Sequence, residues 1–289
     1  MNSYYISEIF KSIQGEGHYT GAPTIWVRSF GCNLECNGFG QDNPTEPKTW
    51  ELPYKSLDIS SITKLEDLPV FSKGCDSSYS WSKKYRHLTE KLTGKETAQR
   101  IESLLPLGCF GCSRAKTEFH LAFTGGEPLL KRSQSLIVDT LNSLQQHPLF
   151  VTFETNGTRL IDPVLQNHIR RTKQVLGCEY FFSVSPKLLS VSGEYNAIKP
   201  KILKQYREIS SAGQLKFVGN GTPESWEEML DACETLDPKG IYSRWVMPVG
   251  ARAEEQHMNA GAIAEQGIDL GFSISARVHC YLWGNKIGT

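Results

Sequence analysis

The chain has 289 residues, enough for one large α/β domain with a full hydrophobic core. Lysine plus arginine equals aspartate plus glutamate at 31 each, so the net charge is zero. This balance argues against a broad surface for nucleic acid or membrane binding, although not against a small local patch. No apolar run approaches the ~18 residues of a membrane-spanning helix and residues 1–14 lack the apolar core of a signal peptide, so we expect a cytoplasmic protein.

A glycine-rich loop comes first, at residues 12–17 with the sequence S-I-Q-G-E-G, and Gly21-Ala22-Pro23 follows it. Glycines on both sides of a carboxylate allow the backbone to approach a ligand closely. On the residues alone, a turn before the first strand is the simpler interpretation.

Residues 24–30, T-I-W-V-R-S-F, form the first predicted strand because β-branched and aromatic side chains dominate it. Arg28 interrupts this strand, and an arginine in a buried strand needs a partner. That partner is either an acidic side chain in a structural ion pair or a substrate carboxylate, which matches the geometry of a guanidinium.

Two cysteines with three residues between them, Cys32 and Cys36, follow this strand. Thiolates at such a spacing bind iron or zinc, because a tight loop directs neighbouring sulfurs to one point. Residues 37–73 are polar and interrupted by prolines, which is typical either of a lid or partner surface or of a passive insertion. Gly74 then precedes a third cysteine, Cys75, in the run G-C-D-S-S-Y-S-W.

A helix is predicted near residues 95–105, with its apolar side chains on one side, and a C-x2-C pair, Cys109 and Cys112, follows it. Such a pair is half of a zinc site, and the sequence has no matching second pair. Eight cysteines in a chain without secretory features favour metal ligands or reduced thiols over disulfides. We therefore expect unligated thiols at this pair rather than a second metal.

Five further strands are predicted, each followed by a loop and several of them by a helix. This alternation implies a parallel sheet, and in barrel-like α/β folds the site lies at the carboxyl ends of the strands. The loops from Cys32 to Pro248 should therefore converge on one region. The predicted strands are 118–123, 149–153, 180–184, 214–218 and 244–247, and the predicted helices are about 133–146, 223–236 and 253–266.

Taken together, these motifs resemble the radical S-adenosylmethionine (SAM) enzymes, and among them the 7-carboxy-7-deazaguanine synthases. Cys32 and Cys36 match the first half of the signature C-x3-C-x2-C, but Phe39 stands where the third cysteine is expected. In this family the third cysteine opens a run close to C-D-T-x-Y-A-W, which resembles the run that begins at Cys75. We predict a complete motif that is split by an insertion at about 39–73, within a single domain of residues 1–289.

The resemblance covers about the whole chain except the insertion and the stretch around Cys109. It rests, in chain order, on S-I-Q-G-E-G, T-G-G-E-P, E-T-N-G-T, S-P-K, L-K-F-V, S-A-R-V-H and L-W-G-N-K. It implies an α/β fold: a partial, open TIM-like barrel of about six parallel strands, with the radical SAM core and an insertion in the cluster loop.

The resemblance also implies roles for individual residues. Cys32, Cys36 and Cys75 would hold a [4Fe–4S] cluster, and the hydroxyl of Ser77 would bind Mg²⁺. No role passes to Thr289, because the tail differs from that of the family. The substrate would contact Ile13, Gln14, Gly15, Arg28 and Thr124, with Glu16 beside them, and SAM would contact Gly74, Asp76, Gly126, Ser185, Pro186 and Lys187.

The implied reaction converts 6-carboxy-5,6,7,8-tetrahydropterin to 7-carboxy-7-deazaguanine with loss of ammonia, on a queuosine-type pathway. The cluster and SAM would supply the radical chemistry. The expected partners are the pterin, an electron donor such as a flavodoxin and a second copy in a homodimer, with no direct nucleic acid contact and no membrane. Two alternatives remain open at this point. One is another radical SAM enzyme such as a glycyl-radical activase. The other is a non-catalytic metal-binding relative, for which Phe39 and the split motif are the best support.

Overall fold

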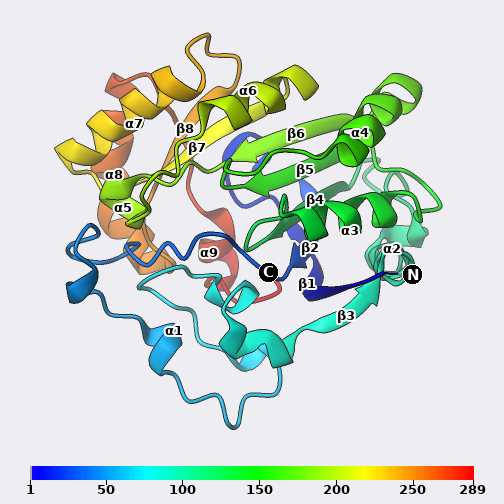
Figure 1. The fold of residues 1–289 in the computed structure, drawn as a ribbon, viewed down its shortest axis with the longest axis horizontal. Coiled ribbons are helices and arrows are strands. Elements are labelled where there is room, and N and C mark those ends of the chain that lie inside the picture. Colours follow the sequence, from blue (N-terminus) through cyan, green and yellow to red (C-terminus); the bar gives the residue numbers. More distant parts are fainter. Residues whose placement is uncertain (1) are drawn as a thin grey trace.

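The computed structural model describes residues 2–289 and is organised around one sheet of nine strands (Figure 1). The strand order is β3-β1-β2-β4-β5-β6-β7-β8-β9, and the two edge strands do not pair with each other, so the sheet stays open. β1 pairs antiparallel with β2 and β3, whereas every pairing from β2 to β9 is parallel. The strands are β1 (Ser3–Ile13), β2 (Pro23–Ser29), β3 (Glu90–Thr93), β4 (His120–Gly125), β5 (Phe150–Thr155), β6 (Glu179–Val184), β7 (Gly213–Gly219), β8 (Ser243–Pro248) and β9 (Ser273–Ile274).

Helices follow the parallel strands β4 to β8 and lie around the outside of the sheet (Figure 1). Their starts carry ordinary capping signals: Asp162 accepts hydrogen bonds from the first turn of α4, and Thr222 does so for α7. A proline at the first helical position begins both of these helices. The helices are α1 (Pro53–Ser56), α2 (Gly94–Leu104), α3 (Lys131–Leu141), α4 (Pro163–Leu176), α5 (Leu189–Ser192), α6 (Pro200–Ile209), α7 (Pro223–Leu236), α8 (Ala253–Asp269) and α9 (Val278–Trp283).

The main hydrophobic core lies between the central strands and these helices. Strands β4 to β7 are buried along almost their whole length, as expected for parallel strands that are covered on both faces. Leu121, Phe153 and Phe182 are fully buried within it. This rigid core holds the carboxyl ends of the strands in fixed positions, where their loops begin.

Residues 39–73 contain little regular structure beyond α1 and two short 3₁₀ turns. They form a second hydrophobic cluster in which Tyr54, Leu68 and Phe71 pack with Tyr79 and Tyr85 from the segment after Cys75. The two ends of this insertion meet, because the N–H of Gly74 donates to the carbonyl of Phe39. Its side chains therefore pack against the chain that follows it rather than extending into solvent.

The sequence predicted the six parallel strands from β2 to β8 within a few residues, and β9, only two residues long, adds a seventh. It did not predict β1, whose last two residues were assigned to a turn, nor helices α4 and α6. β1 lies antiparallel near the sheet edge and is only partly buried, so its hydrophobic pattern is weak.

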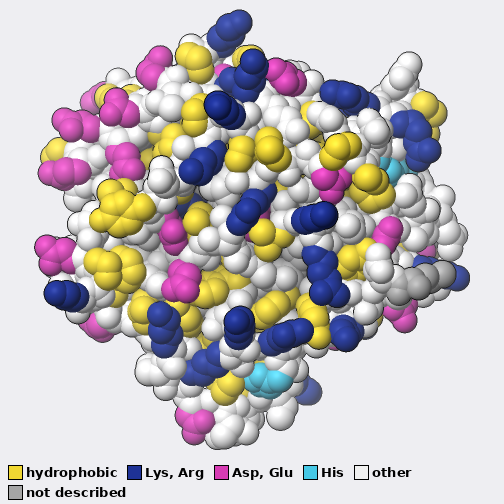
Figure 2. Space-filling view, viewed as in Figure 1, with side chains coloured by type: hydrophobic (Ala, Val, Ile, Leu, Met, Phe, Trp, Pro, Cys, Tyr) yellow, Lys and Arg dark blue, Asp and Glu magenta, His cyan; other side chains and the backbone are white. Residues whose placement is uncertain are grey.

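Among the helices within residues 2–289, none combines the length and the apolar character needed to cross a membrane. The charged side chains are unevenly distributed over the surface (Figure 2), although the net charge is zero. Figure 2 shows many lysine and arginine side chains over the centre and lower half of one face, with acidic side chains gathered towards its left edge. A local basic surface thus exists on a chain without net charge.

Candidate active site

A cavity of about 300 Å³ opens at the carboxyl ends of the parallel strands. The loops after β2, β4, β5, β6 and β8 contribute to its wall, together with Lys216 and Val218 of β7 and residues 285–289. The predicted convergence on one region is confirmed for these five loops, whereas the loop after β7 does not line the cavity. Of the predicted site residues, Pro186 alone does not line the cavity; the others are Ile13, Gln14, Gly15, Arg28, Cys32, Cys36, Gly74, Cys75, Asp76, Ser77, Thr124, Gly126, Ser185 and Lys187.

The loop that begins at Gly31 is tied to two distant segments by backbone hydrogen bonds. The backbone N–H of Gly31 donates to the carbonyl of Ser80 at 2.8 Å, and the carbonyl of Gly31 accepts from the N–H of Glu127 at 2.8 Å. At Gly126, a Cβ atom would collide with the carbonyl of Gly31 and with Cys32, so the loop requires glycine there. These contacts bring the first cysteine pair, the segment after Cys75 and the T-G-G-E-P loop together.

Cys32, Cys36 and Cys75 face this one cavity as free thiols. Burial raises the pKa of Cys32 to about 12 and that of Cys75 to about 11, and it raises the pKa of Cys36 well above its usual value. The three are therefore neutral thiols in the protein alone, and deprotonation requires a positively charged ligand such as iron.

The geometry of these thiols bears on which metal group they suit. Within residues 2–289, no three His, Cys, Asp or Glu side chains are arranged as ligands of a single metal ion. In a [4Fe–4S] cluster each thiolate binds its own iron, so the sulfurs stand further apart than around one ion. Three thiols around a shared cavity fit such a cluster in number and chemistry.

Cys36 occupies a turn with positive φ, at 51°. The carboxylate of Glu194 stabilises this turn, because its Oε1 accepts from the backbone N–H of Glu35 at 2.7 Å and of Cys36 at 2.6 Å. Glu194 was not predicted from the sequence, since it acts through the backbone of a loop that is distant in the chain.

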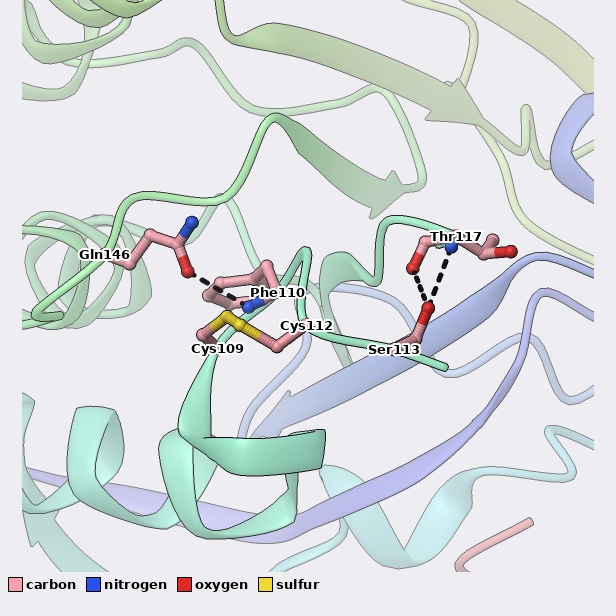
Figure 3. Close-up of a disulfide and its surroundings, with 6 residues drawn as sticks. All are labelled: Cys109, Phe110, Cys112, Ser113, Thr117 and Gln146. Carbon is pink, nitrogen blue, oxygen red and sulfur yellow. Dashed lines mark hydrogen bonds between the residues drawn. A yellow bond between two sulfur atoms is a disulfide. The ribbon is translucent and has the colours of Figure 1, made fainter. Parts of the chain in front are cut away.

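The second cysteine pair differs from our expectation of free thiols. Cys109 and Cys112 form a disulfide outside the cavity (Figure 3). Phe110 between them is buried and is held by Gln146 and Phe119, so the loop turns back on itself. This turn brings the two Cα atoms to 5.4 Å, within the range for a disulfide.

The guanidinium of Arg28 binds a protein carboxylate through Nε, while its two terminal nitrogens have no hydrogen-bond partner among the described residues. Its Nε donates to Oε1 of Glu8 at 2.6 Å, and the hydroxyl of Tyr79 donates to the same oxygen at 2.8 Å. The side chain of Arg28 lines the cavity. The ion pair thus orients the guanidinium and leaves its two terminal nitrogens, its free edge, available for an anion.

Asp76 and Ser77 place oxygens beside the third cysteine. The hydroxyl of Ser77 donates to Oδ1 of Asp76 at 3.2 Å, while Oδ2 accepts from Arg277 at 2.8 Å. Burial alone would raise the pKa of Asp76, but the charge of Arg277 outweighs it and lowers that pKa. Asp76 is therefore ionised at neutral pH.

The charged partners of Glu16 in the cavity wall were not predicted from the sequence. Lys216 and Arg277 both bond to Glu16, at 2.6 and 2.8 Å, and Lys216 also bonds to Glu154 at 3.1 Å. Burial would raise the pKa of Glu16, but these two cations hold it well below its usual range. The available signal was a lysine inside the buried strand L-K-F-V, where a charge needs partners.

No family model matches this chain. The curated 7-carboxy-7-deazaguanine synthase of Rhodopirellula baltica is 27% identical over 292 residues, covering 100% of this chain and 90% of that protein. The one from Escherichia coli K12 is 28% identical over 280 residues, covering 96% and 98% respectively.

The crystal structure of QueE from Escherichia coli matches with a TM-score of 0.52 and 20% identity, over 96% of this chain and 95% of that one. This likeness confirms the expected fold, an open TIM-like α/β barrel. Over nearly its whole length, the chain is similar to curated 7-carboxy-7-deazaguanine synthases.

Proposed function

We propose that the protein converts 6-carboxy-5,6,7,8-tetrahydropterin to 7-carboxy-7-deazaguanine with loss of ammonia. The observation that carries this proposal is the meeting in one cavity of three free thiols, the T-G-G-E-P loop and an arginine with a free edge. The relatives reported above carry the name of this activity over nearly their whole length. They give no support to a glycyl-radical activase or to a non-catalytic relative.

Cys32, Cys36 and Cys75 would hold the [4Fe–4S] cluster that the family implies, and SAM would bind beside it. When bound, the two together supply one-electron hydrogen-abstraction chemistry. The chain itself would orient the reactants within the cavity. The residues that we assign to SAM are Gly74, Asp76, Gly126, Ser185 and Lys187; Pro186 lies outside the cavity and its predicted role has no geometric support.

The substrate would lie in the cavity that Arg28 and Gln14 line. The free edge of Arg28 suits the carboxylate of the pterin, because two parallel N–H donors match two carboxylate oxygens. Gln14 lines the same cavity, and its buried Nε2 has no partner among the described residues. A buried donor without a partner costs about 1–3 kcal/mol, which a carbonyl of the substrate would recover. Ile13, Gly15 and Thr124 complete the proposed contacts.

Mg²⁺ would bind near Ser77, since it is a hard cation that prefers oxygen ligands and the adjacent carboxylate of Asp76 is ionised. The reaction also needs a one-electron donor such as a flavodoxin. The basic face in Figure 2 would attract a donor that presents negative charge. The resemblance further suggests a homodimer.

The decisive experiment is turnover by the anaerobically reconstituted protein with carboxypterin, SAM, a reductant and Mg²⁺. We expect 7-carboxy-7-deazaguanine by mass spectrometry, with release of ammonia. A cluster-loaded protein that cleaves SAM but leaves the pterin unchanged would contradict the proposal and point to another radical SAM reaction. A colourless protein without bound iron would point to a non-catalytic relative.

A further inference from the structure

Lys216 lies in the middle of strand β7 and its side chain is only 4% exposed. A buried ammonium group is unfavourable unless charged partners surround it. Its Nζ donates to Oε2 of Glu16 at 2.6 Å and to Oε2 of Glu154 at 3.1 Å. One cation therefore bridges two carboxylates from segments that are distant in the sequence: Glu16 in the loop after β1, and Glu154 near the end of β5.

The two carboxylates use their oxygens differently. Glu16 has both oxygens engaged, because Oε1 accepts from Arg277 at 2.8 Å and Oε2 from Lys216. Glu154 accepts from Lys216 and from the hydroxyl of Ser183, at 2.9 Å, through Oε2 alone. Among the described residues, no donor reaches Oε1 of Glu154, although this side chain lines the cavity.

Side chains of the neighbouring strands hold Glu154 in position through hydrogen bonds. Gln214 donates to the hydroxyl of Ser183 at 2.8 Å, and Ser183 in turn donates to Glu154. Glu154, Ser183 and Lys216 stand on the adjacent strands β5, β6 and β7. Three neighbouring parallel strands thus hold one carboxylate oxygen in a defined place at the cavity wall.

We propose that Lys216 is a positioning residue for the substrate, holding Glu16 and Glu154 side by side so that Oε1 of Glu154 accepts from N–H groups of a nitrogen heterocycle. This inference rests on the proposed function, because the amino-substituted ring of a pterin carries such donors. Without the cation between them, the two carboxylates would repel each other and move apart. Oε1 of Glu154 would then no longer be held at the cavity wall. The substrate would lose a charge-assisted hydrogen bond to this oxygen.

The test compares Lys216→Met and Lys216→Arg with the wild type in the reconstituted enzyme. Lys204→Met is the matched control, since Lys204 has a 72% exposed side chain and only a surface ion pair with Glu208. We expect the KM and the equilibrium dissociation constant for the carboxypterin to rise by roughly 10- to 100-fold in Lys216→Met, the range for a lost charged hydrogen bond. The KM for SAM should change less than that for the pterin, because Lys216 reaches the proposed SAM contact Asp76 only through Glu16 and Arg277.

Lys216→Arg guards against simple misfolding of the first variant. It keeps the positive charge and should keep the cluster absorbance and the thermal unfolding midpoint, but the planar guanidinium cannot reproduce the single bridging nitrogen. We expect the KM for the pterin to rise more than that for SAM. If either folded Lys216 variant binds the pterin as tightly as the wild type, the inference is wrong while the proposed function stands. If the wild type itself neither binds nor converts the pterin, the proposed function fails and the inference with it.

Discussion

The backbone N–H of Gly74 donates to the carbonyl oxygen of Phe39 at 2.8 Å. Phe39 occupies the position of the expected third cysteine, and Gly74 directly precedes Cys75. This one bond closes the base of the insertion, so the chain leaves the loop of Cys32 and Cys36 at Phe39 and returns beside the same point. Closing such a loop costs little more free energy than closing a shorter one, because the entropy depends only logarithmically on length.

Replacing Arg28 by lysine should weaken substrate binding by about 1–3 kcal/mol, since a point charge cannot donate two parallel hydrogen bonds. Glu8 should still pair with the lysine, and the cluster should survive because no thiol contacts Arg28 through a hydrogen bond. The measurement is the KM for the carboxypterin together with the visible spectrum. Unchanged kinetics would make the arginine a structural residue that serves only its ion pair with Glu8.

Replacing Ser77 by alanine removes a hydroxyl and little volume. We expect the Mg²⁺ dependence of turnover to weaken or vanish, because the proposed ligand oxygen is lost, while the cluster spectrum remains that of the wild type. Turnover measured across a Mg²⁺ titration checks this. A variant that responds to Mg²⁺ like the wild type would exclude Ser77 as a ligand.

Two buried histidines should make the protein less stable in mild acid. Burial lowers the pKa of His120 and of His168 from 6.5 to about 4 in the folded state. Between these values the unfolded chain binds more protons than the folded one, so the free energy of unfolding falls as the pH drops from about 6.5 to about 4. Above pH 6.5 both states are neutral and the contribution is complete.

Urea unfolding at several pH values measures this loss. His120→Phe should make the pH dependence shallower while keeping the ring that stacks on Phe150. His87→Phe is the control, because His87 is exposed on a 3₁₀ turn. An equal pH dependence in His120→Phe and the wild type would contradict the assignment.

The sequence predicted what depends on local pattern. The apolar runs of β4 to β8 and the motifs after each strand located both the parallel sheet and the cavity wall, because a buried parallel strand must be apolar and its loop must follow at one end. What it missed depends on contacts between distant segments. Glu8 meets Arg28 only because β1 pairs with β2 in that register, and Lys216 finds Glu16 only after the sheet has formed.

The same limit explains the second cysteine pair. Whether Cys109 and Cys112 stay free depends on how tightly their loop turns, and the turn is set by the burial of Phe110 in the core. A two-residue spacing is compatible with free thiols, a metal site or a disulfide. Composition therefore suggested reduced thiols where the fold brings the pair into bonding range.

The identity of the third cluster ligand is the prediction on which the proposed function depends. Cys75 lines the cavity with Cys32 and Cys36, whereas Cys109 and Cys112 are joined to each other outside it. We expect Cys75→Ala to abolish the stable [4Fe–4S] cluster and all cleavage of SAM, because two thiolates cannot hold a cluster that needs at least three protein ligands here. Iron and sulfide analysis with a visible spectrum, under anaerobic conditions, provides the measurement.

Cys109→Ala and Cys112→Ala are the matched controls, since each removes a cysteine from the same chain without touching the cavity. Both should keep the iron content and spectrum of the wild type. Their cost should be limited to stability, at most about 2 kcal/mol for a disulfide that closes so short a loop. A full cluster in Cys75→Ala, combined with its loss in either control, would show that the motif is not split by the insertion and that the chain between Phe39 and Gly74 does not deliver the third ligand.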